Sequence, residues 1–230
     1  MTVRPRIRLD LRREIALQIC WFSFLLLPAS LATAASGALK LESIGPCNES
    51  SVPDSIRRDL VQSGYRVTLE GNSTVEMWPS AKISAGSKAR DDQTYALAPS
   101  TFVGLIHFST NTRDYRGNAI PAGFYNLRYA LQPADGDHLG TSPTPDFVLL
   151  VPPAVDPDPN KDIRFDQLVE LSRKATGKKH PGPLNLVPPD AKEFPSVNTD
   201  SDDHTILFFK MKTDSGELPM ALVIKGTTTS

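Results

Sequence analysis

Apolar and polar side chains alternate along several short stretches of the chain, a pattern typical of strands that bury one face. In "YRVTLE" (65–70) every second residue is apolar, and "STVEMWP" (73–79) repeats the alternation. Gly71-Asn72 stands between the two stretches, and glycine supplies the positive φ that a tight turn between antiparallel strands requires. The region from 65 to 79 is therefore predicted to form a β-hairpin.

Further short stretches have the composition of strands and are separated by turn residues, which fits a chain of 230 residues with 20 prolines and 14 glycines. The stretch 146–152 is apolar at nearly every position, as expected of a central strand covered on both faces. The pattern predicts a mainly all-β fold, an antiparallel sandwich of about seven to eight strands with one or two short helices. The additional predicted strands are 102–109, 124–131, 146–152, 205–212 and 219–226.

Helical spacing of apolar residues occurs only in 53–64 and 162–177. In the second segment Asp162 is the expected N-cap and Gly177 the expected stop. Proline-rich connectors surround this helix, and the one at 178–203 is long enough to wrap the surface or to be partly disordered. The predicted organisation is a signal segment (1–35), an N-terminal segment with a short helix (36–64), a sandwich core (65–152), a proline-rich connector with its helix (153–203), a C-terminal hairpin (204–226) and a tail (227–230).

The first 35 residues differ from the rest of the chain. Five arginines precede an apolar run from Ile15 to Leu27, and Ala32-Thr33-Ala34 fits a signal peptidase site. We expect an exported protein, periplasmic or extracellular, with no membrane span after cleavage. The alternative is an uncleaved anchor, but the run is shorter than the roughly 20 residues that a spanning helix needs.

Removal of that segment takes away five arginines and two acidic residues, leaving 20 basic and 24 acidic residues, a net charge of −4. An acidic surface lacks the electrostatic attraction that dominates binding to phosphate backbones, so no nucleic-acid partner is expected. Cys47 is then the single cysteine, and we expect a buried, unreactive thiol rather than a disulfide partner.

The sequence contains no G-x-S-x-G, H-E-x-x-H, P-loop, dinucleotide-binding or C-x-x-C motif. The expected function is therefore a non-catalytic module that binds a protein, a glycan or another envelope component, with no cofactor. Aromatic residues near turns are its candidate contacts, since they supply contact area at low entropic cost. These aromatics are Trp78, Tyr115 and Phe124, and the further candidate ligand-binding residues are Arg128, Asp137 and His138.

The alternative function is an envelope hydrolase or metal-dependent enzyme whose site is assembled by the fold from dispersed residues. Its candidates are His107, Asp135, Asp137 and His138, with Arg128 as an anion clamp. No two histidines are close enough in sequence to mark a local metal site.

A second metal hypothesis concerns calcium. Asp156, Asp158, Asn160 and Asp162 place oxygen ligands at every second position, as in the first half of an EF-hand loop. Lys161 stands where that loop has its glycine, and the prolines between these residues favour an extended linker instead.

The stretch "IPAGFYNLRYAL" (120–131) begins with a turn, Pro121 to Gly123, and continues with Tyr125 and Leu127 on one strand face. It resembles the turn-and-strand motif of small exported sandwich domains, including transthyretin-like and carboxypeptidase-regulatory-like modules, and of bacterial secreted proteins without an assigned function. The resemblance implies a sandwich fold and transfers no functional residue.

Overall fold

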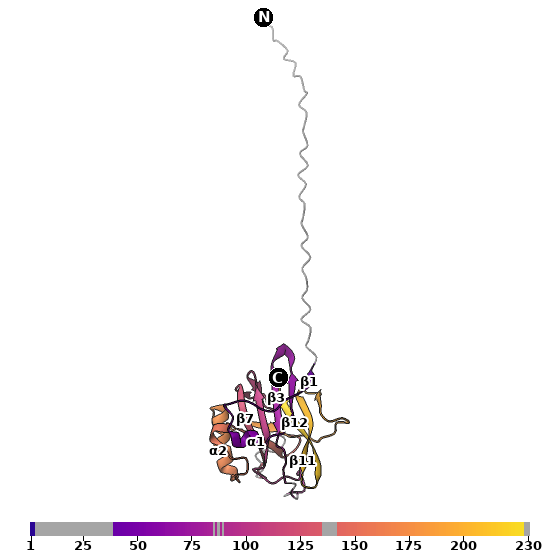
Figure 1. The fold of residues 1–230 in the computed structure, drawn as a ribbon. Coiled ribbons are helices and arrows are strands. Elements are labelled where there is room, and N and C mark those ends of the chain that lie inside the picture. Colours follow the sequence, from indigo (N-terminus) through magenta and orange to yellow (C-terminus); the bar gives the residue numbers. More distant parts are fainter. Residues whose placement is uncertain (3–38, 85, 87, 89, 135–141, 228–230) are drawn as a thin grey trace. The chain divides into compact units, whose positions relative to one another are not determined.

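The computed structural model describes residues 1–2, 39–84, 86, 88, 90–134 and 142–227 (Figure 1). All of the elements below belong to the compact unit Ser36–Ser230. The predicted signal segment, apart from its first two residues, lies outside the described residues.

The described chain is built mainly from antiparallel strands, which confirms the predicted all-β class. A seven-stranded sheet has the order β1-β2-β3-β4-β7-β8-β9, and a three-stranded sheet has the order β10-β11-β12. A small hairpin, β5–β6, forms a third sheet. The strands are β1 (Lys40–Ile44), β2 (Gly64–Thr68), β3 (Thr74–Pro79), β4 (Phe102–Phe108), β5 (Thr112–Arg113), β6 (Ala119–Ile120), β7 (Gly123–Leu131), β8 (Asp146–Val151), β9 (Pro183–Asn185), β10 (Ser196–Thr199), β11 (Thr205–Thr213) and β12 (Gly216–Lys225).

One hydrophobic cluster is shared by the two larger sheets. The alternation predicted for β7 is confirmed there, since Tyr125, Leu127 and Tyr129 are buried on the side of this cluster. The sheets also connect at one edge, where Leu186, just after β9, forms a bridge with Leu222 of β12. The residues of β11 and β12 in the cluster are Leu207, Phe209, Met211, Met220, Leu222 and Ile224.

The opposite face of the seven-stranded sheet is covered by two helices, α1 (Asp54–Arg58) and α2 (Phe165–Thr176). Figure 1 shows α2 and the three-stranded sheet on opposite sides of β7. Leu168 of α2 packs on β8 beside Leu149, within a cluster separate from the shared one. Because both faces of β8 are covered, its continuous apolar sequence has a structural reason.

The ends of α2 differ in how well the sequence predicted them. Gly177 ends the helix in the left-handed conformation at φ 64°, and its N–H bonds to Arg173 O, as predicted. The predicted N-cap, Asp162, was wrong: the helix begins at Phe165 after Arg164, and no side chain caps it. Burial of Ile163 fixes the chain just before this start.

The proline-rich segment 178–203 contains two short strands that the sequence pattern did not predict, β9 and β10. The hairpin β5–β6 was also not predicted, because two-residue strands give no readable alternation. Among the described helices, none has the length and apolar character needed to cross a membrane.

Candidate functional site

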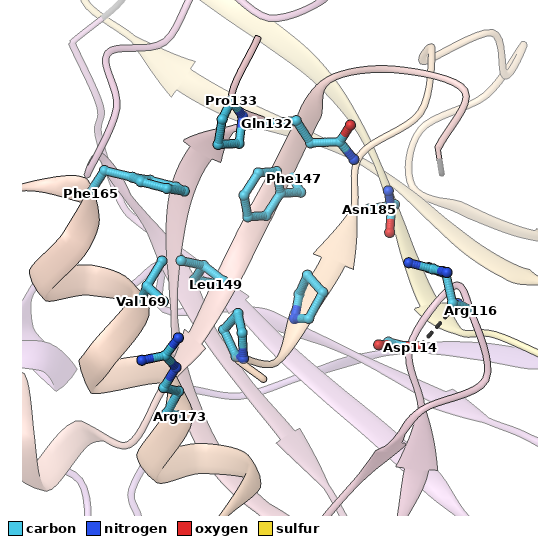
Figure 2. Close-up of a pocket in the computed structure, with 12 residues that line it drawn as sticks. Asp114, Arg116, Gln132, Pro133, Phe147, Leu149, Phe165, Val169, Arg173 and Asn185 are labelled. Carbon is cyan, nitrogen blue, oxygen red and sulfur yellow. Dashed lines mark hydrogen bonds between the residues drawn. The ribbon is translucent and has the colours of Figure 1, made fainter. Parts of the chain in front are cut away.

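A cavity of about 330 Å³ opens between α2 and the edge of the seven-stranded sheet, and we call it the α2 cavity (Figure 2). Its volume lies at the lower end of the range of small-molecule sites. Its walls are supplied by α2, the paired strands β8 and β9, the turn of the hairpin β5–β6, and the residues just after β7. The lining residues are Asp114, Arg116, Gln132, Pro133, Phe147, Leu149, Phe165, Val169, Arg173, Pro181, Pro183 and Asn185.

The floor and sides of the α2 cavity are apolar. Figure 2 shows Phe165 and Val169 on α2 facing Phe147 and Leu149 on β8. Phe165 is 40% exposed, which makes it one of the few large apolar side chains that the described fold leaves open to solvent. An exposed aromatic ring beside an apolar hollow is typical of a ligand site rather than of a satisfied core.

Two arginines stand at separate ends of the α2 cavity. Arg173 forms an ion pair with Glu170 through Nη1, while its Nε is buried without a hydrogen-bond partner. Arg116 is exposed at the hairpin turn, near Asn185 (Figure 2), and no side-chain partner of its guanidinium lies among the described residues. A ligand carrying an acceptor group would satisfy donors that are now unpaired.

The acidic residue of the lining, Asp114, is committed to its own turn. Its Oδ1 accepts hydrogen bonds from the backbone N–H groups of Arg116 and Asn118, at 3.0 and 2.8 Å. Its Oδ2 accepts a bond of 2.9 Å from the side chain of Asn118. These bonds fix the hairpin turn and so position Arg116 at the cavity.

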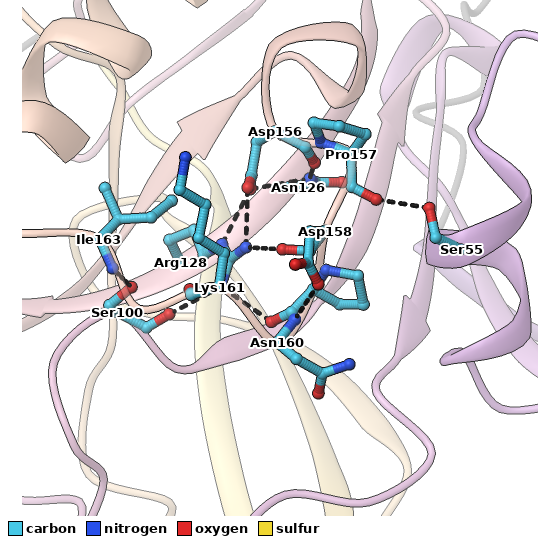
Figure 3. A network of polar contacts seen from close by, with 11 residues as sticks. Ser55, Ser100, Asn126, Arg128, Asp156, Pro157, Asp158, Asn160, Lys161 and Ile163 are labelled. Carbon is cyan, nitrogen blue, oxygen red and sulfur yellow. Dashed lines mark hydrogen bonds and ion pairs between the residues drawn. The ribbon is translucent and has the colours of Figure 1, made fainter.

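A different polar arrangement lies under the loop after β8, and we call it the Arg128 network (Figure 3). Arg128 is 1% exposed and forms a bidentate ion pair with Asp156, from Nε to Oδ2 at 2.8 Å and from Nη2 to Oδ1 at 2.7 Å. Asn126 also donates to Asp156 Oδ2, at 3.0 Å. The remaining guanidinium protons reach backbone carbonyls of Ser100, Asp158, Pro159 and Lys161.

Arg128 therefore corrects a sequence-based prediction. We expected its guanidinium to be an anion clamp open to a ligand. Every nitrogen of its guanidinium is instead bonded within the protein, and the side chain is inaccessible. Its observed role is to hold the segment 156–161 against the sheet.

The four predicted calcium ligands lie in or beside this network without forming a common centre. The carboxylate of Asp156 is bound to Arg128, and Asp158 Oδ1 accepts the backbone N–H of Asn160 at 3.0 Å. Asn160 and Asp162 are exposed. In the described part of the chain, no three residues among His, Cys, Asp and Glu gather as a metal site requires.

None of the predicted aromatic contacts is among the lining residues of the α2 cavity. Trp78 is 5% exposed, and its Nε1 donates to Gly45 O at 2.9 Å, so its ring is not on the surface as a contact residue would be. Tyr115 is partly buried and stacks on His204 with ring centroids 4.2 Å apart. Phe124 stacks on His107 at 4.1 Å.

Of the residues proposed for an enzyme, the structure describes His107 and Arg128. His107 Nδ1 lies 3.2 Å from Glu76 Oε2, and the other oxygen of Glu76 accepts a bond from Arg66 Nε at 2.8 Å. Asp135, Asp137 and His138 lie outside the described residues. The structure does not bring His107 and Arg128 together in one cavity of the described chain.

Cys47 is buried beside Trp78 and Ile56 in the cluster under α1. Burial raises the pKa of its thiol above the ordinary value and outweighs the hydrogen bond with the backbone of Glu49, which lowers it. A protonated, enclosed thiol is a poor nucleophile, as the sequence led us to expect.

Comparisons with protein-family models, with curated proteins and with solved structures found no match.

Sequence reasoning missed the residues that line the α2 cavity. Phe165 and Val169 fit the helical spacing of apolar residues in 162–177, and such spacing alone does not tell a packed face from one side of a cavity. Phe165 is the first residue of α2, and only the structure shows that its side chain stays exposed there.

Proposed function

We propose that this protein is an exported, non-catalytic binding domain whose ligand site is the α2 cavity. The ligand is a small amphipathic anion, with an apolar body on Phe147, Leu149 and Val169 and an acidic group at Arg173 or Arg116. The observation that carries the proposal is the exposed Phe165 beside an apolar hollow in which the buried Arg173 Nε has no partner.

Two physical arguments support this class of ligand. Burial of apolar surface contributes about 25 cal/mol per Å², so an apolar body gains affinity from the floor of the cavity. An acidic group gains charge-assisted hydrogen bonds from arginine, which are stronger than neutral ones. The committed carboxylate of Asp114 does not compete with the ligand for these donors, because its bonds lie within its own turn.

The test uses 8-anilinonaphthalene-1-sulfonate, a fluorescent probe that combines an apolar ring system with an anionic group. We expect saturable fluorescence enhancement with a stoichiometry of one probe per chain. Arg173→Gln removes the buried donor and is expected to weaken binding about tenfold, the value of one charged hydrogen bond. Val169→Glu places a carboxylate on the apolar wall and is expected to abolish the signal.

Arg164→Gln is the matched control, since it removes the same charge immediately before α2, where Arg164 is exposed and paired with Asp166. It is expected to bind the probe as the unaltered protein does. Equal loss of binding in the Arg164 and Arg173 variants would contradict the proposal, as would binding that persists in Val169→Glu.

A further inference from the structure

A second, smaller cavity is lined by residues of β3, β5 and β12, and we call it the Lys225 cavity. Its volume is about 130 Å³. At about 30 Å³ per water molecule in the liquid, this space matches a small ion rather than an extended ligand. The lining residues are Leu69, Ser73, Thr74, Val75, Phe108, Thr110, Asn111, Thr112, Arg113 and Lys225.

The charged side chains of the Lys225 cavity are both cationic. Lys225, at the end of β12, is partly buried and has no hydrogen-bond or ion-pair partner among the described residues. Arg113 donates from Nη1 to Gly117 O at 2.7 Å, which leaves its other guanidinium protons available. No Asp or Glu is among the described residues that line the cavity.

The polar wall adds donors that the protein does not satisfy. Thr112 Oγ1 is buried and has no hydrogen-bond partner. Asn111 uses Oδ1 to accept the N–H of Ala122 at 3.0 Å, so its amide NH₂ group is free to donate. A buried hydroxyl without a partner costs free energy, and a bound anion would remove that cost.

We propose that the Lys225 cavity binds a small tetrahedral oxyanion of the phosphate type. Lys225 and Arg113 supply two positive charges, which balance the charge of phosphate between −1 and −2 at neutral pH. Thr112 and Asn111 donate to its oxygens. The donors come from two places, Lys225 on β12 and the segment 111–113 at β5. A tetrahedral anion has more acceptor oxygens for them than a flat carboxylate. The site does not depend on the proposed function of the α2 cavity.

The experiment is calorimetric titration of the purified protein with inorganic phosphate, glycerol 3-phosphate and acetate at constant ionic strength. We expect saturable binding of inorganic phosphate and no measurable binding of acetate. Equal affinity for glycerol 3-phosphate indicates a site that accepts phosphate esters, whereas its exclusion indicates a site for the free ion. Both results agree with a site for a tetrahedral anion. Acetate binding as tightly as phosphate would overturn the proposal.

Three variants test the assignment of residues. Lys225→Gln is expected to weaken phosphate binding at least about tenfold, the effect of one charged hydrogen bond. Thr112→Val keeps the shape of the side chain and is expected to weaken binding severalfold. Lys210→Gln is the control, because Lys210 lies on neighbouring β11 and is paired at the surface with Glu217 at 2.8 Å. Failure of phosphate to bind, or equal loss in the Lys210 and Lys225 variants, would overturn the proposal.

Discussion

The guanidinium of Arg128 lies 2.7 Å from the carboxylate of Asp156, and the two side chains are 1% and 0% exposed. Arg128 is on β7 and Asp156 follows β8, so this pair attaches the chain leading to α2 to the central strands (Figure 3). A stable position of α2 is a condition for the α2 cavity, since the helix forms one of its walls.

Arg128→Met is predicted to destabilise the fold by about 3–5 kcal/mol, the cost of removing one partner of a buried ion pair. The substitution leaves the Asp156 carboxylate buried without its cation and frees four backbone carbonyls. Chemical denaturation followed by circular dichroism measures the effect. Exchange of the exposed Arg164 for Met serves as control and should leave the denaturation midpoint unchanged. An Arg128 variant with the same midpoint as the unaltered protein would refute the role given to the Arg128 network.

Calcium is predicted to leave the melting temperature unchanged relative to EDTA. The physical reason is that Asp156, the first ligand of the hypothetical calcium loop, is already bound by Arg128 and Asn126. Differential scanning calorimetry in the two conditions checks this. An increase of the melting temperature with calcium would show that the segment 156–162 binds the ion after all.

Gly226→Ala is predicted to weaken ligand binding in both the α2 cavity and the Lys225 cavity. A Cβ at position 226 would lie 1.8 Å from the backbone oxygen of Asp114, so the hairpin β5–β6 must move. That hairpin carries Arg113 to the Lys225 cavity and Arg116 to the α2 cavity. We expect a loss of about 1–3 kcal/mol in stability, which is typical of overpacking. We also expect weaker binding of 8-anilinonaphthalene-1-sulfonate and of inorganic phosphate.

The control is Gly45→Ala, since a Cβ at Gly45 meets no atom within 4 Å. Denaturation and the two titrations should give the same values for this variant as for the unaltered protein. Retention of both affinities in Gly226→Ala would show that the hairpin does not position the two arginines.

Stability is predicted to fall in acid partly through Asp200. Burial raises the pKa of its carboxyl, but hydrogen bonds from the backbone and ring of His204 outweigh burial, and the pKa lies below its ordinary value of 3.8. The ionised carboxylate therefore stabilises the fold above the ordinary pKa, and this contribution is lost as pH falls through the lowered value.

Denaturation of the unaltered protein and of Asp200→Asn between about pH 2 and pH 6 measures this contribution. The variant should be less stable at the upper end of the range, and the two curves should converge in acid. Asp91→Asn alters an exposed carboxyl and should follow the unaltered protein throughout. A difference in stability between Asp200→Asn and the unaltered protein that grows as the pH falls would contradict the predicted direction.

Much of the fold was predictable because its strands are long enough to show their pattern. The stretch 146–152 has apolar residues throughout, and β8 is covered on both faces. The turn at Gly71 was predicted from residue type, and its φ of 73° is one that glycine adopts without strain. β9 and β10 were missed because strands of three or four residues among prolines are too short to show an alternation of apolar and polar side chains. The resemblance to transthyretin-like modules and the sandwich packing stay predictions.

The site residues were less predictable because tertiary contacts decide their roles. Arg128 had a readable signal, a single cation in a largely apolar strand, but its partners are the distant carboxylate of Asp156 and backbone carbonyls that no sequence pattern reveals. Asp156 was assigned to calcium by spacing alone, since the sequence does not show that the loop turns back onto β7. Arg116 and Arg173 are far apart in sequence, and only the packing of α2 brings them to one cavity.

Nuclear magnetic resonance can locate the bound probe within the α2 cavity. Methyl groups of Leu149 and Val169 line the α2 cavity, while Leu222 lies in the core shared by the two sheets. With 8-anilinonaphthalene-1-sulfonate bound, we predict intermolecular nuclear Overhauser effects to the methyls of Leu149 and Val169 and none to those of Leu222. Contacts to Leu222 without contacts to Leu149 and Val169 would contradict the assignment of the α2 cavity as the binding site.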